Sequence, residues 1–136
     1  MKRTVRSDFG EVYIREDGVI HARLFSNVEV DLEKAKQYHS LIEYMSESKP
    51  HCTVIDISGV KTITKEARNF LQKNSSEWGK TIAVGLVTNG FAARVMGNFF
   101  LTANKPNYPI KIFSDTLEAT QWARHEYLKN LTKIAS

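Results

Sequence analysis

The sequence predicts a single α/β domain built on a mixed β-sheet, in which an N-terminal hairpin is followed by alternating helices and parallel strands. Three observations support this prediction. Two alternating apolar segments flank an Asp-Gly pair near the start of the chain. Nearly continuous apolar runs over 52–57 and 81–87 are typical of strands covered on both faces. Helical periodicity fills the intervals between the later strands. The expected order is therefore β-β-α-β-α-β-α-β-α.

Composition limits the classes of protein to which the chain can belong. Its 136 residues, 42% of them hydrophobic and 25% charged, suit one domain with a hydrophobic core. No apolar stretch approaches the roughly 18 residues of a membrane helix, so we expect no membrane insertion. Cys52 is the only cysteine, which fits a reducing cytoplasm. The net charge of +4 is scattered among acids, so we expect no nucleic-acid partner.

The hairpin is the first element that the sequence predicts. Asp17-Gly18 separates two alternating segments, and both residues tolerate the positive φ of a tight turn. The inward-facing positions are expected to be Val12, Ile14, Ile20, Ala22 and Leu24. Residues 1–7 are expected to be a flexible tip of a domain that spans residues 1–136. No linker or internal repeat divides the chain.

The remaining elements follow from caps and periodicity. Asp31, Thr64 and Asp115 are expected to cap helices, because each oxygen-bearing side chain precedes an apolar pattern of helical spacing. The elements expected after the hairpin are a helix over 32–48, strand 52–57, a helix over 65–78, strand 81–87 in the interior of the sheet, a helix over 91–103, strand 110–113 at or next to an edge, and a helix from 116 onward.

The segment 51–66 carries the most functional information. Asp56 stands near the end of a buried strand, and the loops at the carboxyl ends of such strands form the functional sites of open α/β sheets. Asp56 has two interpretations, a general base in a pocket or an acceptor of backbone N–H groups that organises the following loop. The second is favoured, because buried acids need hydrogen-bond partners.

This segment resembles the signature of STAS domains, whose pattern runs roughly Asp-Leu-Ser-Gly-Val. The match is Asp56-Ile57-Ser58-Gly59-Val60, and the strand 81–87 and the ending from Phe113 to Trp122 agree with the SpoIIAA-like branch of the family. The resemblance covers about residues 9–130 and implies a SpoIIAA-like fold. It also implies a regulatory, non-catalytic function in protein–protein interaction.

The second half of the family signature is not matched. Antagonists of this family are controlled by phosphorylation of a serine at the helix start, and the resemblance places Glu66 at that position. One interpretation is that Glu66 supplies a permanent charge in place of a phosphate. The other is that Glu66 is a first-turn acid favoured by the helix dipole. Thr62 and Thr64 are alternative phosphate acceptors, although Thr64 also suits a cap.

The predicted helix over 91–103 has an apolar arc wider than one buried stripe needs. It packs either on the sheet and its neighbouring helices, or it forms a surface for a second copy of the chain or for a lipid-like ligand. The residues of this arc are Phe91, Val95, Met96, Phe99 and Phe100.

Catalytic chemistry is not indicated by the sequence. The four histidines lack the i, i+4 spacing of a zinc helix, and His39 falls on the apolar stripe of its helix. Cys52 begins a buried strand, where a structural thiol is the expected role. No glycine pattern of a nucleotide site is present. We therefore expect no enzyme, no metal and no cofactor.

Two functions remain in competition. The first is a STAS-like regulatory module that binds a protein partner through the loop and helix start after strand 52–57, with Asp56, Ser58, Gly59, Thr62, Thr64 and Glu66 as the surface. The alternative is a carrier or sensor of a small apolar ligand, bound between the helix over 91–103 and the sheet.

Overall fold

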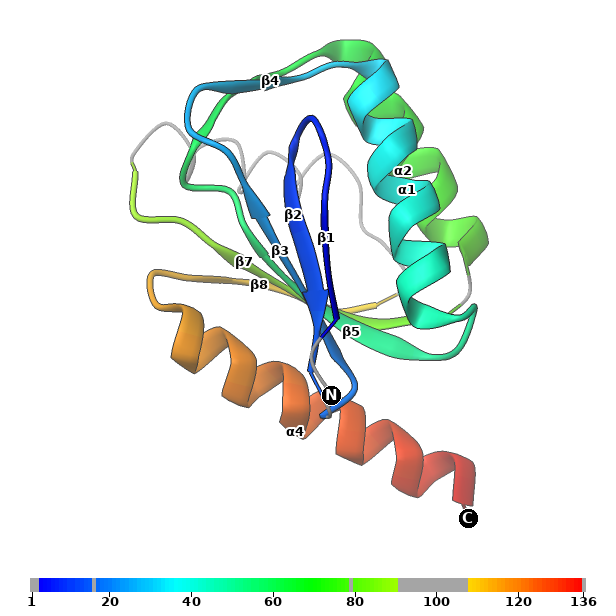
Figure 1. Cartoon of the computed structure of the whole chain (residues 1–136). Helices are drawn as coiled ribbons and strands as arrows, with labels where there is room; N and C mark the ends of the chain where they lie inside the picture. Colours follow the sequence, from blue (N-terminus) through cyan, green and yellow to red (C-terminus); the bar gives the residue numbers. More distant parts are fainter. Residues whose placement is uncertain (1–2, 16, 79, 91–107, 136) are drawn as a thin grey trace.

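The computed structural model describes residues 3–15, 17–78, 80–90 and 108–135 (Figure 1). The described strands are β1 (Arg3–Arg6), β2 (Gly10–Ile14), β3 (Val19–Leu24), β4 (Val28–Val30), β5 (His51–Asp56), β6 (Val60–Ile63), β7 (Thr81–Val87) and β8 (Ile110–Phe113). The described helices are α1 (Leu32–Ser46), α2 (Lys65–Trp78) and α4 (Thr116–Ala135). The predicted helix over 91–103 lies outside the described residues.

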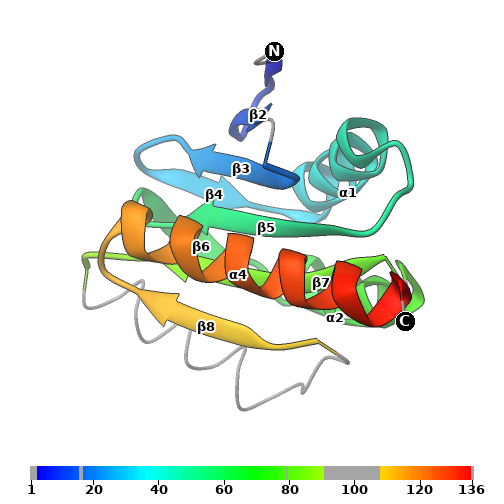
Figure 2. The same ribbon diagram turned by 90° about the horizontal axis from the view of Figure 1, so that it is seen from below.

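The larger sheet contains six strands in the order β1-β2-β3-β5-β7-β8 (Figure 2). β1, β2 and β3 pair antiparallel, whereas β3, β5, β7 and β8 pair in parallel. The predicted mixed sheet and the hairpin at Asp17-Gly18 are therefore confirmed. Among the described strands β7 is interior and β8 lies at an edge, as predicted, and Val84 and Leu86 are each only 8% exposed.

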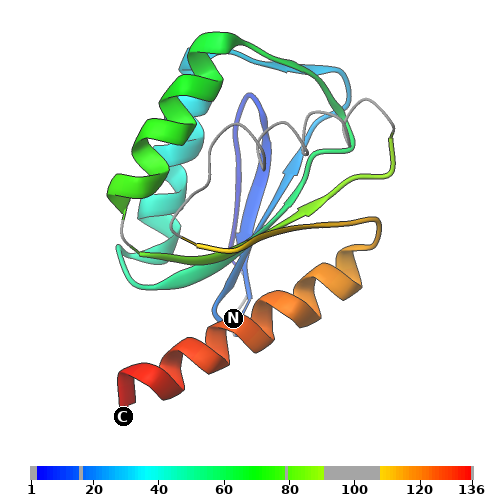
Figure 3. The same cartoon turned by 180° about the vertical axis from the view of Figure 1, so that it is seen from behind.

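The described helices lie on both faces of this sheet. α1 and α2 lie side by side on one face, and α4 crosses the other face (Figure 3). α4 packs chiefly on β5 and β7 and touches β3 and β8 less extensively. The core on the side of α1 includes Phe9, Val12, Ile20, Ala22, Ile42, Met45 and Leu86. The core on the side of α4 includes Val19, Cys52, Val54, Ala83, Val87, Ala119 and Ala123.

Three strands were not expected from the sequence. Arg3–Arg6 form β1, which pairs with β2, although we expected a flexible tip over residues 1–7. β4 and β6 form a separate two-stranded parallel sheet. These strands have only three or four residues each, and such short segments carry too few alternating positions to be distinguished from loops.

The three predicted helix caps are confirmed by hydrogen bonds. Asp31 Oδ1 accepts the N–H of Lys34 at 2.9 Å, and Thr64 Oγ1 accepts the N–H of Ala67 at 3.1 Å. The carboxylate of Asp115 accepts the N–H groups of Leu117 and Glu118. Each bond satisfies an N–H group that has no partner within its own helix.

Candidate interaction site

Asp56 ends β5 and fixes the backbone that follows it. Its Oδ1 accepts a hydrogen bond from the N–H of Ser58 at 2.9 Å, which closes a turn of the Asx type. The Asp56 side chain is half-buried, and the bonded N–H offsets part of the cost of removing a carboxylate from water. The contact agrees with the favoured interpretation of Asp56, an acceptor of backbone N–H groups that organises the following loop.

Gly59 is required by the close approach of another segment. A Cβ atom at this position would lie 2.7 Å from the carbonyl oxygen of Phe25, so any larger residue would push the β3–β4 connection away. Ile57 and Val60 on either side are 6% and 8% exposed and belong to the core. The segment that carries the family resemblance thus consists of a turn acid, the serine whose N–H it binds, two core residues and a glycine at a close contact.

The residues after Gly59 form β6, whereas we expected a loop between strand 52–57 and the next helix. β6 pairs in parallel with β4, and the N–H of Thr64 donates to the carbonyl oxygen of Val30 at 2.9 Å. The exposed Lys61 and Thr62 gave this segment its polar character. Its pairing partner is far away in the sequence, so the pattern of the segment alone does not indicate a strand. The backbone of the candidate site is therefore held on a small sheet.

The start of α2 completes the site. Thr64 caps the helix through its side chain, and its carbonyl oxygen accepts the N–H of Arg68 at 3.0 Å. Ala67 is fully buried, whereas Lys65 and Glu66 are exposed. Glu66 lies in the first turn, where the positive end of the helix dipole favours an acid. The exposed side chains on this frame are Lys61, Thr62, Lys65 and Glu66, and we call them the β6–α2 surface.

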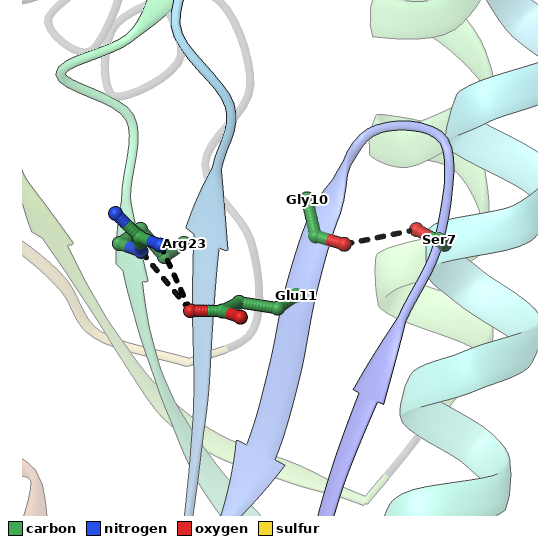
Figure 4. A network of polar contacts seen from close by, with 4 residues as sticks. All are labelled: Ser7, Gly10, Glu11 and Arg23. Atoms are coloured by element: carbon green, nitrogen blue, oxygen red, sulfur yellow. Dashed lines mark hydrogen bonds and ion pairs between the residues drawn. The ribbon is translucent and has the colours of Figure 1, made fainter.

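A row of charged residues crosses the sheet beside Asp56. In the strand register Arg6 lies opposite Glu11, Glu11 opposite Arg23, and Arg23 opposite Asp56. Nε and Nη2 of Arg23 donate to Oε1 of Glu11 at 3.2 and 3.0 Å (Figure 4). Opposite charges therefore alternate across four strands, an arrangement that stabilises cross-strand pairs. We call these four residues the charge row.

The charge row was not predicted from the sequence. The sequence places Glu11 and Arg23 on the outer face of the hairpin, and this is the one signal that it offers. The position of Asp56 beside Arg23 depends on the parallel register of β3 with β5. That register is set by contacts between distant segments, which periodicity does not reveal.

Two titratable groups are buried at the beginning of β5. Burial, and secondarily the charge of Glu126, raises the pKa of the Cys52 thiol to about 12, so the thiol stays protonated and weakly nucleophilic. Nδ1 of His51 lies 2.9 Å from the carbonyl oxygen of Lys49, and burial lowers the pKa of this imidazole. An adjacent pocket of about 120 Å³ is lined by Ile42, Glu43, Ser46, Ser48, His51 and Lys80.

Other expected features fall partly outside the described part of the chain. The apolar arc of Phe91, Val95, Met96, Phe99 and Phe100 lies entirely outside it. Among the residues that are described, no group of three or more His, Cys, Asp or Glu side chains is arranged to hold a metal ion. Within the same residues, no helix is both long and apolar enough to cross a membrane. His39 contacts Phe70 edge to face and lies 3.6 Å from the Glu43 carboxylate.

Comparisons with known proteins agree with this architecture. An uncharacterised protein of the DUF3478 family from Shewanella loihica PV-4, described as having a SpoIIAA-like fold, superposes with a TM-score of 0.56 at 17% identity, covering 90% of this chain and 95% of that one. The anti-sigma factor antagonist SpoIIAA in its unphosphorylated form superposes with a TM-score of 0.52 at 12% identity, covering 83% and 96% of the two chains. The chain thus has the predicted SpoIIAA-like fold.

Sequence comparison gives a family with no assigned function. No curated protein matches the chain. Residues 12–126 match the family described as domain of unknown function DUF7793. This match includes Arg23 and Asp56 of the charge row, but neither Arg6 nor Glu11, and it includes the whole β6–α2 surface. The chain therefore belongs to the DUF7793 family and adopts within it a fold of the SpoIIAA type.

Proposed function

We propose that the protein is a non-catalytic regulatory module that binds a protein partner through the β6–α2 surface. One observation carries the proposal: the backbone from Ser58 to Glu66 is held at several points, while four side chains on it are exposed. A surface that is ordered before binding loses little conformational entropy when a partner docks. The likeness of the fold to an anti-sigma factor antagonist supports a regulatory role.

Glu66 is the residue through which this surface is proposed to act. The resemblance to STAS domains aligns it with a regulated serine, and the comparison structure of SpoIIAA is described as the unphosphorylated form. The Glu66 side chain is exposed on the first turn of α2. In this proposal its permanent negative charge contacts a donor on the partner, so binding does not depend on phosphorylation.

The test begins with capture of the partner from the native host by the tagged full-length chain. Affinity is then measured for Glu66→Gln and Glu66→Ser, which remove the charge, and for Glu66→Asp, which keeps it. The first two variants should both weaken binding by about 1 kcal/mol or more, as expected for a lost charge-assisted hydrogen bond. Glu66→Asp should bind nearly as well as the original chain.

A matched control is available in α1. Glu33 is likewise an exposed acid in the first turn of a helix, so Glu33→Gln makes the same chemical change at another helix start. It should leave affinity unchanged. Equal binding by all Glu66 variants would reduce Glu66 to a first-turn acid. Turnover that Asp56→Asn abolishes, with the fold intact, would overturn the non-catalytic role.

The functions assigned to the helix over 91–103 stay predictions. A homodimer, or a site for a lipid-like ligand, would use Phe91, Met96 or Phe99, which lie outside the described residues. Sedimentation at about 50 μM, a concentration at which a dimer of ordinary affinity persists, distinguishes dimer from monomer. A Phe99→Glu variant should dissociate the dimer. A cytoplasmic location likewise remains a prediction from the single cysteine.

A further inference from the structure

β1 forms one edge of the six-stranded sheet. It is the terminal strand in the sheet order, so no described strand pairs with its outer side. The β1–β2 hairpin also lies to one side of α4, which packs chiefly on β5 and β7 (Figure 2). An edge of this kind has backbone N–H and C=O groups available to pair with an added strand.

The hydrogen-bond pattern identifies which groups of β1 point outward. The N–H of Ser7 donates to the carbonyl oxygen of Gly10 at 2.9 Å, which makes this a bonded pair of the hairpin. Bonded and non-bonded pairs alternate along antiparallel strands. Val5 is therefore bonded to β2, whereas the N–H and C=O groups of Thr4 and Arg6 point away from it. The Thr4 and Arg6 side chains are also exposed.

The charge row ends at this open edge with a positive residue. Across the sheet the order is negative at Asp56, positive at Arg23, negative at Glu11 and positive at Arg6. Glu11 is already bonded to Arg23 through one oxygen. In the described part of the chain no carboxylate forms an ion pair with Arg6. Its guanidinium carbon instead lies 5.3 Å from the centre of the Phe25 ring.

Arginine stacking on this face leaves hydrogen-bond donors free. The guanidinium carbon of Arg15 lies 5.5 Å from the centre of the Tyr13 ring. This ring stacks on the imidazole of His21, with the two ring centres 4.8 Å apart. A guanidinium that stacks on an aromatic ring still presents the N–H groups of its planar fork to a carboxylate. The exposed arginines at positions 6, 15 and 23 thus outnumber the two acids of the charge row, Glu11 and Asp56, on this face.

The charge of the edge also disfavours a second copy as its partner. Residues 1–6 include three basic residues and no acid. Pairing of β1 with β1 of another molecule would bring these like charges together, which destabilises a cross-strand pair. A partner strand that carries acidic residues on the same face would instead continue the alternation of the charge row.

We propose that β1 accepts an extended acidic segment of a partner protein as an added strand, with a carboxylate of that segment bonded to Arg6. Backbone hydrogen bonds to Thr4 and Arg6 provide affinity, as in other cases of strand addition, and the side-chain charges provide selectivity. This surface is separate from the β6–α2 surface, so either can fail without the other.

The test uses a synthetic peptide of about eight alternating threonine and glutamate residues, because side chains of a strand alternate between faces. Glutamate then lies on the face of Arg6 and threonine on the other. The control peptide replaces every glutamate with glutamine. The full-length chain should bind the acidic peptide and not the control. Arg6→Gln should lower the affinity about tenfold, as expected for a lost charge-assisted bond, and Arg6→Lys should lower it less.

Amide hydrogen exchange reports where the peptide binds. The N–H groups of Thr4 and Arg6 should exchange more slowly with the peptide bound, whereas that of Val5, already bonded to β2, should change little. Thr4→Pro removes one outward N–H and should therefore abolish binding. The variant should still fold, because proline is tolerated at sheet edges. If that variant fails to fold, the exchange measurement on the original chain still decides the question.

Two further variants separate this surface from other sites. Arg124→Gln removes an exposed arginine of α4, and Glu66→Gln alters the β6–α2 surface; both should bind the peptide normally. The proposal is overturned by equal binding of the glutamine peptide, by an unchanged affinity of Arg6→Gln, or by no binding at about 1 mM peptide, the weak end of specific affinities. Tighter binding of an oligothymidylate than of the peptide would also overturn it and would indicate a nucleic-acid surface.

Discussion

The ring of Tyr127 in α4 lies directly against Gly18 in the β2–β3 turn. A Cβ atom built on Gly18 would fall 2.7 Å from two carbon atoms of that ring. Gly18 also has a φ of 80°, in the left-handed region that favours glycine. Gly18 thus has two roles: it adopts the backbone conformation of the turn, and its lack of a side chain lets α4 pack against that turn. Beside this contact, Nε of Arg124 lies 3.6 Å from the Asp17 carboxylate.

Gly18→Ala should therefore lower the free energy of unfolding by more than about 1 kcal/mol. Alanine is strained at this positive φ, and its methyl group would collide with the ring of Tyr127. Urea unfolding measures the change. Adding Tyr127→Ala removes the collision, so the two substitutions together should cost less than the sum of their separate effects. Gly90 has no atom within 4 Å of the corresponding position, and Gly90→Ala should have a small effect. Equal losses at the two glycines would contradict the contact.

Thr64→Ala removes the side-chain oxygen that accepts the N–H of Ala67. The free energy of unfolding should fall by about 1 kcal/mol, the usual effect of losing a helix cap. Thr64→Ser keeps the oxygen and should preserve most of the stability. Thermal unfolding of the three proteins provides the comparison, and an unchanged midpoint in Thr64→Ala would exclude the cap.

Cys52 should resist thiol reagents in the folded protein, because burial raises its pKa to about 12 and keeps the thiol protonated. Reaction with iodoacetamide at about pH 8 should be much slower in buffer than in denaturant, where the thiol regains an ordinary pKa. The chain has one cysteine, so the incorporated label reports this residue alone. Equal rates in both conditions would show that Cys52 is accessible.

Stability should decrease in mild acid because of His51. Burial lowers the pKa of its imidazole from the ordinary value of 6.5, so the unfolded chain binds a proton more readily than the folded chain. The stabilising contribution is complete above about pH 6.5 and is lost as the pH falls toward the lower, folded-state pKa. Denaturant unfolding at about pH 7.5 and 5.5 brackets the beginning of this loss.

Two variants assign the acid sensitivity to its source. His51→Gln should reduce the stability difference between the two pH values, because its side chain does not titrate. His125 is exposed on α4, and His125→Gln should leave the difference unchanged. The same pH dependence in His51→Gln as in the original chain would assign the effect to other groups.

Local signals in the sequence predicted the elements whose causes are local. Asp17-Gly18 indicated the hairpin, the apolar run over 81–87 indicated an interior strand, and Thr64 indicated a helix start. In each case the residues that cause the structure lie within a few positions of one another. The Asx turn at Asp56 was predictable for the same reason, since it joins residues two apart.

Features that depend on distant pairing were missed. β1 contains one apolar residue, Val5, and becomes a strand because β2 lies beside it. β4 and β6 pair although α1 and β5 lie between them in the sequence. The role of Gly59 depends on its close approach to the backbone of Phe25. The charge row requires the register of four strands at once. These features follow from the tertiary arrangement rather than from periodicity or propensity.

The charge row also bears on how accurately the hairpin folds. A strand that slips by one residue exposes its apolar side chains to water, so the loss of hydrophobic burial disfavours that register. A slip by two residues keeps the same side chains facing the core, so hydrophobic burial alone does not disfavour that register. In β2 and β3 such a slip would move Glu11 from Arg23 to a position opposite His21 or Phe25. The ion pair would be lost, so electrostatics distinguishes the native alignment from the misaligned hairpins that the hydrophobic core would tolerate.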